Sequence, residues 1–417
     1  MSKIKQIHQL YRSIFKEDLY LVENVKDVRD AFWNIQKNNY STNLLGFLPD
    51  KIRSLVNISN FIYESSSLYD EIIVFAFDAI SFDYYLSDIE QVAKEYKLLS
   101  SVLSSVFPST STTAWTSIIT GSTPSEHGIY GTSFYLKEFD KNYNWIFNAL
   151  ADKEKFISLW KPKKDPHLNL SNKKTIFSRL KDVGFTNFYL DSHGKMNPFP
   201  VLGITDGAKH IPYLKGDFDE LKRKPKDLLA YFLNQTSKLL QNNRGKKIIW
   251  NYLDVDDFIH ENGYKELSKH DIWKALFKFW SVHKTSNRIF MLISDHGQTN
   301  QVNSGINILK TSILNEDLAY NSAGAGRTMF FYPKKEKMNE VKFWLEKIVG
   351  DSGLVLTKEE LITHGLIERN AVALDRIGDL ITLATKPNFP SAGAKYFAEH
   401  GSLHSEEMFV PLIIQAS

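Results

Sequence analysis

Three short apolar runs, each closely followed by an aspartate, constrain the fold of this chain more than any other feature. The runs cover residues 72–77, 248–253 and 289–294, and the aspartates that follow them are Asp78, Asp256 and Asp295. A short run dense in β-branched and aromatic residues is typical of a strand buried on both faces of a parallel sheet. Because ligands of open α/β sheets bind beyond the carboxyl ends of such strands, we expect the three carboxylates to meet at one edge.

Two of these aspartates have a histidine at a spacing that suits a metal site. His260 lies four residues after Asp256, and His296 directly follows Asp295. Like charges crowded at one edge need a cation between them. Carboxylate plus imidazole suits Zn²⁺, with Mn²⁺ or iron as alternatives. A single aspartate of this kind would more often cap a helix or lie on the surface, but three with two matched histidines favour a metal site.

The hydroxyl-rich segment 107–121 reads as a loop that opens a short helix. Ser and Thr cap helix N-termini well, and Gly121 is a typical helix stop. A hydroxyl at such an N-terminus faces free backbone N–H groups and the positive end of the helix dipole, which favour an anion. If a metal also binds that oxygen, the pKa of the hydroxyl falls and it becomes a nucleophile. Taken alone, the same segment would more often be a helix cap without chemistry.

The order of these motifs resembles that of the type I phosphodiesterase and nucleotide pyrophosphatase family, which belongs to the alkaline phosphatase superfamily. The matching residues are, in chain order, Asp78, Phe107-Pro108, Thr120-Gly121, His127-Gly128-Ile129, Asp256 with His260, Asp295-His296-Gly297, and His400-Gly401 before Glu406-Glu407 and Pro411. They extend over most of the chain. The resemblance implies an alkaline-phosphatase-like α/β/α sandwich around a mostly parallel sheet.

The resemblance also implies two divalent cations and assigns ligands to each. One cation would be held by Asp256, His260 and His400, and the other by Asp78, Ser111, Asp295 and His296. Ser111 is the third residue after Phe-Pro, where relatives usually have a threonine nucleophile. Thr110 and Thr112 adjoin it, so the nucleophile could lie one residue to either side. His404 is an alternative to His400, which we prefer because a glycine follows it.

Two further residues bear on the substrate. Nucleotide-cleaving relatives have an asparagine where this chain has Thr132, whose hydroxyl could donate to a phosphoryl oxygen instead. Arg327, within the glycine-rich stretch 324–328, could reach an anionic substrate, although the stretch reads better as a tight turn into a strand. The implied activity is hydrolysis of phosphodiester or pyrophosphate bonds in a small phosphorylated substrate, with a nucleotide as one candidate. It would proceed through a covalent phosphoseryl intermediate on Ser111.

Two other functions stay open. A phosphomonoesterase could use the same site, and a non-catalytic descendant could serve as a binding or scaffold protein. All seven ligand positions hold usable side chains, which speaks against the second alternative. A net charge of +3 is too small to indicate a nucleic-acid polymer as partner. The chain has no Cys, which excludes disulfides, thiolate metal sites and the formylglycine chemistry of ordinary sulfatases.

The domain organisation follows from where the motifs lie. Residues 1–66 show helical periodicity and carry no motif, so we expect a helical N-terminal extension that packs on the core or acts as an interaction arm. The catalytic domain is expected over 67–417, with a small inserted cap at about 298–375. No apolar leader or membrane-spanning stretch is visible, so we expect no membrane partner and a cytoplasmic location.

Overall fold

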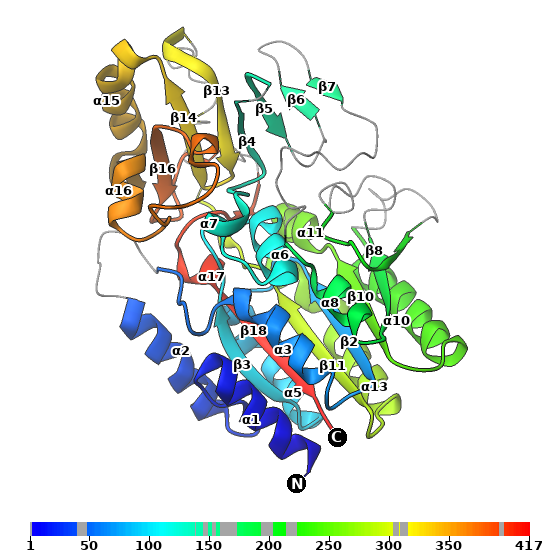
Figure 1. The fold of residues 1–417 in the computed structure, drawn as a ribbon. Helices are drawn as coiled ribbons and strands as arrows, with labels where there is room; N and C mark the ends of the chain where they lie inside the picture. Colours follow the sequence, from blue (N-terminus) through cyan, green and yellow to red (C-terminus); the bar gives the residue numbers. More distant parts are fainter. Residues whose placement is uncertain are drawn as a thin grey trace.

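Three neighbouring parallel strands form the centre of the main sheet in the computed structural model (Figure 1). They are β10 (Lys247–Leu253), β2 (Glu71–Phe77) and β11 (Arg288–Ser294), in that order across the sheet. In their register, Val74 of β2 pairs with Trp250 on one side and with Met291 on the other. These strands coincide with the three apolar runs, so the predicted strands are confirmed. The structure describes residues 2–39, 48–137, 139–144, 149–151, 156–158, 173–192, 203–213, 223–302, 308, 316–391 and 396–417.

Five more strands extend this centre on both sides, in the order β1-β3-β18-β11-β2-β10-β8-β9. They are β1 (Tyr20–Leu21), β3 (Leu99–Ser104), β8 (Thr186–Asp191), β9 (Lys209–Pro212) and β18 (Phe409–Gln415). Only β1 and β18 run antiparallel to their neighbours in this sheet, and all other pairs are parallel. The mostly parallel sheet is therefore confirmed.

Helices cover both faces of the sheet, because successive side chains of a strand point to opposite sides. Val74 of β2 belongs to one buried cluster, and its neighbours Ile73 and Phe75 belong to the other. The first face is covered by α1 (Lys3–Phe15), α3 (Ile58–Ser65), α6 (Ser111–Thr120) and α8 (Ile176–Asp182). The second face is covered by α2 (Val25–Asn39), α5 (Glu90–Glu95), α10 (Pro225–Asn242) and α13 (Ile272–Val282). The result is a three-layered α/β/α sandwich (Figure 1).

The described part of the N-terminal extension packs against this sandwich. α1 buries Ile7, Tyr11 and Phe15 on one face of the sheet, and α2 lies on the other. Between them, β1 pairs with β3 at the edge of the sheet, an element that the helical prediction over 1–66 did not include. The difference arises because the open edge of β3 offers backbone partners that no helical pattern in the sequence reveals. The buried apolar residues of α1 and α2 thus pack against the sheet of the same chain and are not available to a partner.

A second sheet lies beside the sandwich, in the upper part of Figure 1, in the order β15-β16-β14-β13-β4-β5-β6-β7. Its strands are β4 (Ser133–Leu136), β5 (Lys141–Asn144), β6 (Ala149–Ala151), β7 (Phe156–Ser158), β13 (Leu318–Ala325), β14 (Thr328–Pro333), β15 (Gly353–Thr357) and β16 (Leu380–Ala384), with α15 (Met338–Val349) and α16 (Lys358–Thr363) beside them. The structure differs from the expected inserted cap at about 298–375. The second sheet combines strands from residues 133–158 with strands from residues 318–384. A contact between Ser133 and Gly324 connects the two stretches, and single-sequence periodicity cannot predict such a pairing.

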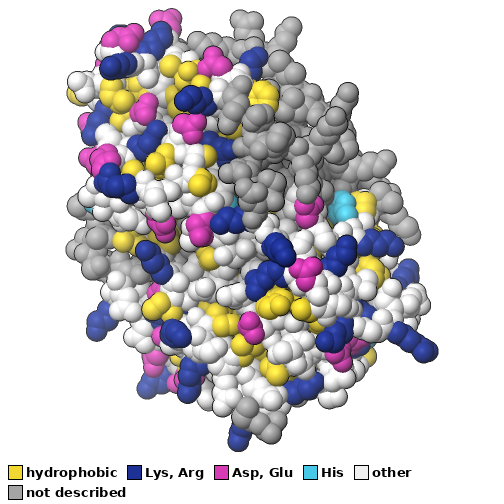
Figure 2. Space-filling model, in the orientation of Figure 1, with side chains coloured by type: hydrophobic (Ala, Val, Ile, Leu, Met, Phe, Trp, Pro, Cys, Tyr) yellow, Lys and Arg dark blue, Asp and Glu magenta, His cyan; other side chains and the backbone are white. Residues whose placement is uncertain are grey.

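Short elements complete the edge that carries the site. They are α4 (Phe82–Tyr84), α7 (Pro124–His127), α11 (Asp256–Asn262), α12 (Tyr264–Leu267), α17 (Ser405–Met408), β12 (Thr299–Asn300) and β17 (Ala398–Glu399). No helix in the described ranges combines the length and the apolarity needed to cross a bilayer. Figure 2 shows acidic and basic side chains interspersed over the face in view, without a large region of one sign.

Candidate metal and catalytic site

The carboxyl ends of the three central strands bring Asp78, Ser111, Asp295 and His296 together. Asp78 follows β2 and Asp295 follows β11, and both are buried. His296 Nε2 lies 3.5 Å from Asp78 Oδ1 and 3.2 Å from Asp295 Oδ2. Ser111 Oγ donates to Asp78 Oδ1 at 3.2 Å and lies 3.1 Å from His296 Nε2. These four side chains form one compact group around the hydroxyl.

Asp256, His260 and His400 form a second group next to the first. Asp256 and His260 lie one turn apart on α11, with His260 Nε2 3.1 Å from Asp256 Oδ2. His400 Nε2 lies 3.7 Å from the same oxygen, and its ring stacks on that of His296 with the centroids 3.9 Å apart. Ligand atoms of Asp78, Asp256 and His296 also fall within 4.8 Å of one another. Asp256 is therefore close to both groups, whereas the family resemblance assigns it to one cation only.

The alternatives to Ser111 and His400 lie outside the two groups. Thr110 Oγ1 pairs with Thr132 Oγ1 at 3.3 Å, and the buried Thr112 Oγ1 has no hydrogen-bond partner among the described residues. Of the three adjacent hydroxyls, only that of Ser111 contacts ligand side chains. His404 precedes α17, and its Nδ1 lies 3.2 Å from Thr299 Oγ1. The geometry thus places Ser111 and His400 in the cluster. Thr132 lies next to the cluster, because its hydroxyl contacts that of Thr110, the neighbour of Ser111.

The start of α6 explains how Ser111 is presented. Ser111 is the first residue of the helix, and Thr110 before it is extended and makes no side-chain capping bond. The first-turn N–H groups are therefore left without a capping side chain, which favours an anion at this end. The helix stops at Gly121, whose φ of +66° is left-handed, as predicted.

The turn that leads to Thr132 is fixed by His127 at the end of α7. His127 is buried, and its Nδ1 accepts a hydrogen bond from the Ile129 backbone N–H. Its Nε2 must then carry the proton and donate to Ser117 Oγ at 2.9 Å. Burial lowers the pKa of His127 to about 3, which keeps this arrangement neutral. His127 thus holds the turn after α7 and lies outside the two groups of proposed ligands.

The three histidines of the cluster are all oriented in the same way. Nδ1 of His260 donates to the Ala398 carbonyl at 2.7 Å, and Nδ1 of His400 donates to the Ser109 carbonyl at 3.0 Å. Nδ1 of His296 donates to the carbonyl of Gly297 at 3.0 Å. Because a carbonyl oxygen can only accept, Nε2 of each ring is left to face the carboxylates. This is the arrangement that histidine metal ligands adopt.

The electrostatics of the cluster also call for added positive charge. Burial, followed by the charge of Asp256, raises the pKa of Asp78 to about 7. Burial and the neighbouring Asp78 raise the pKa of Asp295 well above its usual value. Burial lowers the pKa of His260, but the carboxylates of Asp256 and Glu399 outweigh it and hold the pKa at about 10. The raised pKa values of Asp78 and Asp295 reflect carboxylates that repel each other unless protons or cations lie between them. Asp256 differs, because burial raises its pKa but the charges of His260 and His400 outweigh burial and hold the pKa well below the usual value.

One buried oxygen provides a direct test of whether these residues fit a metal. Asp295 Oδ2 is buried and has no hydrogen-bond partner in the described part of the chain. Leaving a buried carboxylate oxygen without a donor is costly, and a cation would satisfy it. The donors are carboxylate, imidazole and hydroxyl without thiolate, a set that suits zinc, manganese or iron. The residues could therefore hold divalent cations.

The glycine-rich stretch 324–328 forms the tight turn into a strand that the sequence favoured, and Arg327 is not exposed for contact with an anionic substrate. It lies in the turn between β13 and β14, and its side chain is fully buried. Its Nε donates to Glu407 Oε1 at 2.7 Å, and Nη2 donates to the Lys386 carbonyl at 3.1 Å. The alternative role of Arg327, contact with an anionic substrate, does not apply, because Glu407 binds the guanidinium inside the protein. Glu407 also accepts from the Ser402 N–H, so the pair braces the loop that carries His400.

Breaking this pair should destabilise the fold. Replacing Arg327 with methionine should lower the free energy of unfolding by about 3–5 kcal/mol, because it leaves the buried Glu407 carboxylate without its cation. Urea unfolding of the two proteins at equal metal loading measures the difference. The exposed pair of Arg369 and Glu359 provides the control, since Arg369→Met should change stability little. A loss below about 1 kcal/mol for Arg327→Met would contradict this reading.

Three side chains that the sequence analysis did not single out also touch the ligand carboxylates. Trp115 and Tyr252 donate to Asp78, and Gln298 donates to Asp256. Trp115 lies one turn after Ser111 on α6, which is the only local sequence signal of its position. Tyr252 and Gln298 have none, because tertiary structure alone decides what their polar atoms meet.

Comparison with known proteins identifies the family of the chain. The family model for type I phosphodiesterase / nucleotide pyrophosphatase matches residues 72–402. No curated protein sequence matches the chain.

Solved structures of similar fold include two enzymes of different description. Mouse ectonucleotide pyrophosphatase/phosphodiesterase 5, solved as an inactive variant with AMP, is 16% identical with a TM-score of 0.55, over 82% of this chain and 87% of that one. Phosphonoacetate hydrolase from Sinorhizobium meliloti 1021, solved with phosphonoformate, is 17% identical with a TM-score of 0.55, over 83% of this chain and 89% of that one. These likenesses confirm the predicted alkaline-phosphatase-like fold. With the family match over most of its length, the chain belongs to the type I phosphodiesterase / nucleotide pyrophosphatase family.

Proposed function

We propose that this protein is a two-cation phosphoesterase that hydrolyses phosphodiester or pyrophosphate bonds, with Ser111 as its nucleophile. Membership of the family supports phosphoester hydrolysis in general. The observation that carries the finer proposal is the position of Ser111 Oγ, at hydrogen-bond distance from both Asp78 and His296. A hydroxyl with only a structural role has no need of a neighbouring cluster of three carboxylates, two of them buried, and three imidazoles. All seven proposed ligands are present, which speaks against a non-catalytic descendant.

The chain's own residues can orient and activate the reacting groups. Divalent cations bound here would neutralise the phosphate and lower the pKa of the serine hydroxyl. The hydrogen bond from Ser111 to Asp78 directs the proton away from the oxygen that attacks. Attack forms a bond from Ser111 Oγ to phosphorus and breaks the bond to the leaving oxygen, which gives a covalent phosphoseryl intermediate. Water then attacks phosphorus and breaks its bond to Ser111 Oγ, which releases the phosphate product, and a proton from the water returns to the serine oxygen.

The phosphoryl oxygens would face neutral donors at the start of α6. These donors are the first-turn N–H groups and the hydroxyl of Thr132, which lies 3.3 Å from that of Thr110. Among the described residues, no Lys or Arg makes a hydrogen bond or ion pair with Ser111, Asp78 or Thr132. A phosphomonoester carries one more charged oxygen than a diester, and Arg327 is not free to neutralise it. The site therefore favours a diester.

This preference gives a direct prediction. The protein should cleave bis-p-nitrophenyl phosphate with a higher kcat/KM than p-nitrophenyl phosphate at the same zinc loading. We expect a ratio of at least about tenfold, or about 1.4 kcal/mol in transition-state binding. A tenfold preference for the monoester would overturn the diesterase proposal and leave the two-cation site in place. The phosphomonoesterase alternative would then become the function of this same site.

The natural substrate is proposed to be a small phosphorylated molecule. AMP is bound in the mouse structure and phosphonoformate in the bacterial one. A nucleotide is thus one candidate, although Thr132 stands where nucleotide-cleaving relatives have asparagine. Turnover of dinucleotide and sugar-nucleotide pyrophosphates, compared with that of the bis-ester, tests this candidate.

A further inference from the structure

The two oxygens of the Asp78 carboxylate are used for different purposes. Oδ2 accepts a hydrogen bond from the indole Nε1 of Trp115 at 3.2 Å and another from the hydroxyl of Tyr252. Oδ1 instead faces Ser111 and His296. An indole nitrogen can only donate, and Tyr252 likewise donates to a carboxylate oxygen. Only Oδ1 is therefore available to a cation.

The two donors to Asp78 also hold each other in place. Trp115 and Tyr252 are buried, and their rings meet edge to face with the centroids 5.5 Å apart. Trp115 belongs to the helix that presents Ser111, and Tyr252 belongs to β10, which pairs with β2 before Asp78. The carboxylate is thus fixed between the helix of the nucleophile and the central strands.

Asp256 shows the same division of its oxygens. The Gln298 amide Nε2 donates to Oδ1 and also to the Asp256 backbone carbonyl, at 3.1 Å for the carbonyl. Oδ2 faces His260 at 3.1 Å and His400 at 3.7 Å. Gln298 is buried and lies just beyond the loop that carries Asp295 and His296. It therefore links the loop of one group of ligands to a carboxylate of the other.

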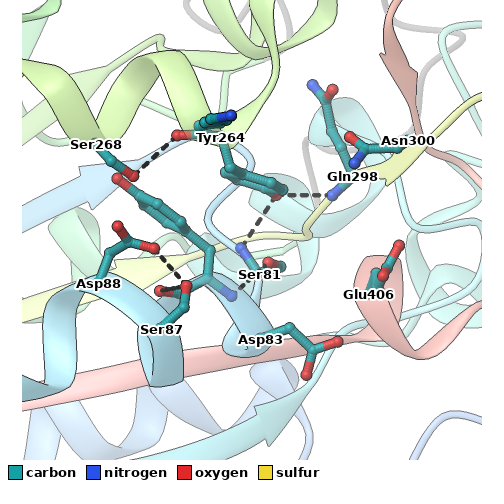
Figure 3. Close-up of a pocket in the computed structure, with 11 residues that line it drawn as sticks. Ser81, Asp83, Ser87, Asp88, Tyr264, Ser268, Gln298, Asn300 and Glu406 are labelled. Carbon is teal, nitrogen blue, oxygen red and sulfur yellow. Dashed lines mark hydrogen bonds between the residues drawn. The ribbon is translucent and has the colours of Figure 1, made fainter.

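Figure 3 shows how the backbone of Gln298 is held. The Tyr264 hydroxyl accepts from the backbone N–H groups of Ser81 and Gln298, at 3.3 and 2.9 Å. The Tyr264 hydroxyl thereby connects the loop of Ser81 to the loop of Gln298. All three residues line a cavity of about 380 Å³. In the same view the Gln298 side chain extends away from Asp83 and Glu406 on the far side of this cavity. The amide nitrogen of Gln298 donates to Asp256, and its Oε1 has no hydrogen-bond partner among the described residues.

We propose that Trp115, Tyr252 and Gln298 are positioning residues that leave one oxygen of each aspartate free for its cation. Trp115 and Tyr252 act on the cation beside Ser111, and Gln298 acts on the cation beside His260. The inference rests on the proposed two-cation function, and it adds which side chains set the affinity of each cation. Partners that orient metal ligands typically change metal affinity by about 10–100-fold when they are removed. None of the three residues would touch the substrate.

The test is a zinc titration by calorimetry on protein stripped with a chelator. Trp115→Phe and Tyr252→Phe should each weaken one of two zinc ions by about 10–100-fold, and Gln298→Met should weaken the other by a similar factor. Cadmium-113 NMR identifies the sites, because the resonance affected in Trp115→Phe should be the one lost in Asp295→Asn. Trp280→Phe and Tyr85→Phe are matched controls. Trp280 is buried with no hydrogen-bond partner for its Nε1 in the described ranges, and the Tyr85 hydroxyl donates to the distant Ser100.

The outcomes separate this inference from the proposed function. If the unaltered protein binds no zinc, the two-cation function fails and the inference fails with it. If it binds two zinc ions but the variants match the controls, or each variant weakens both ions equally, only the positioning inference is overturned. Trp115→Phe and Tyr252→Phe remove donors from the same oxygen, so either one carries the test if the other does not fold.

Discussion

Replacing Ser111 with alanine should lower kcat for a diester by at least about a thousandfold while both cations remain bound. The hydroxyl is the atom that would form the bond to phosphorus, and no other described hydroxyl contacts Asp78 and His296 in its place. The side chain contributes one of several ligands to its cation, so its loss should leave the zinc content near that of the unaltered protein. Steady-state kinetics with bis-p-nitrophenyl phosphate and metal analysis of the same sample measure both quantities.

Three variants at or near the same helix serve as comparisons for Ser111→Ala. Ser117→Ala removes a hydroxyl that bonds to His127 inside the core, and it should keep most of the activity. Thr110→Ala and Thr112→Ala test the neighbouring hydroxyls. If Ser111→Ala stays active while one of these two does not, the nucleophile lies one residue away from the proposed position. Acid quenching followed by intact-mass measurement should also show a phosphoryl adduct on the unaltered protein and none on Ser111→Ala.

Replacing Asp256 with alanine should have an effect of similar size, but through loss of metal. A carboxylate oxygen of Asp256 lies within 4.8 Å of ligand atoms in both groups. The first group contains His260 and His400, and the second contains Asp78 and His296. Its removal should lower the zinc content from two ions to one or fewer per chain. Each cation supplies several kcal/mol of transition-state stabilisation, so kcat/KM should fall by at least about a thousandfold.

Glu261 offers a matched control on the same helix. Its side chain is exposed and lies 3.7 Å from Arg223, with no part in the cluster. Glu261→Ala should therefore keep both zinc ions and the activity. If Asp256→Ala retains two tightly bound zinc ions, Asp256 is not a ligand and its place between the two groups has another cause.

The positions of the central strands and of several proposed ligands were predictable, because the local sequence determines them. Apolar runs before Asp78 and Asp295 predict buried strands, and the topology of a parallel sheet then places their ends at one edge. The spacing of Asp256 and His260 matches one helical turn, so α11 presents both from one face. The position of His400 followed from resemblance to a family, since no local rule joins it to residues so distant in sequence.

Features that depend on contacts between residues far apart in the sequence could not be predicted from local sequence. The second sheet joins Ser133 to Gly324, and nothing in either segment indicates the other. The glycines around Arg327 indicated the tight turn, but the position of its side chain could not be predicted, because the buried Glu407 decides where it points. Trp115 and Tyr252 read as ordinary core aromatics, and most of their surface is used that way. Only their polar atoms meet Asp78, and that depends on the exact docking of α6 on the sheet.

The most direct test of two-cation catalysis is to measure metal content and diester turnover on the same preparation as a chelator removes the metal and zinc restores it. The proposed function predicts two divalent cations per chain in the active protein. Turnover of bis-p-nitrophenyl phosphate should disappear as they are removed and return as about two equivalents of zinc are added back. Full turnover in protein with fewer than one cation per chain would contradict it.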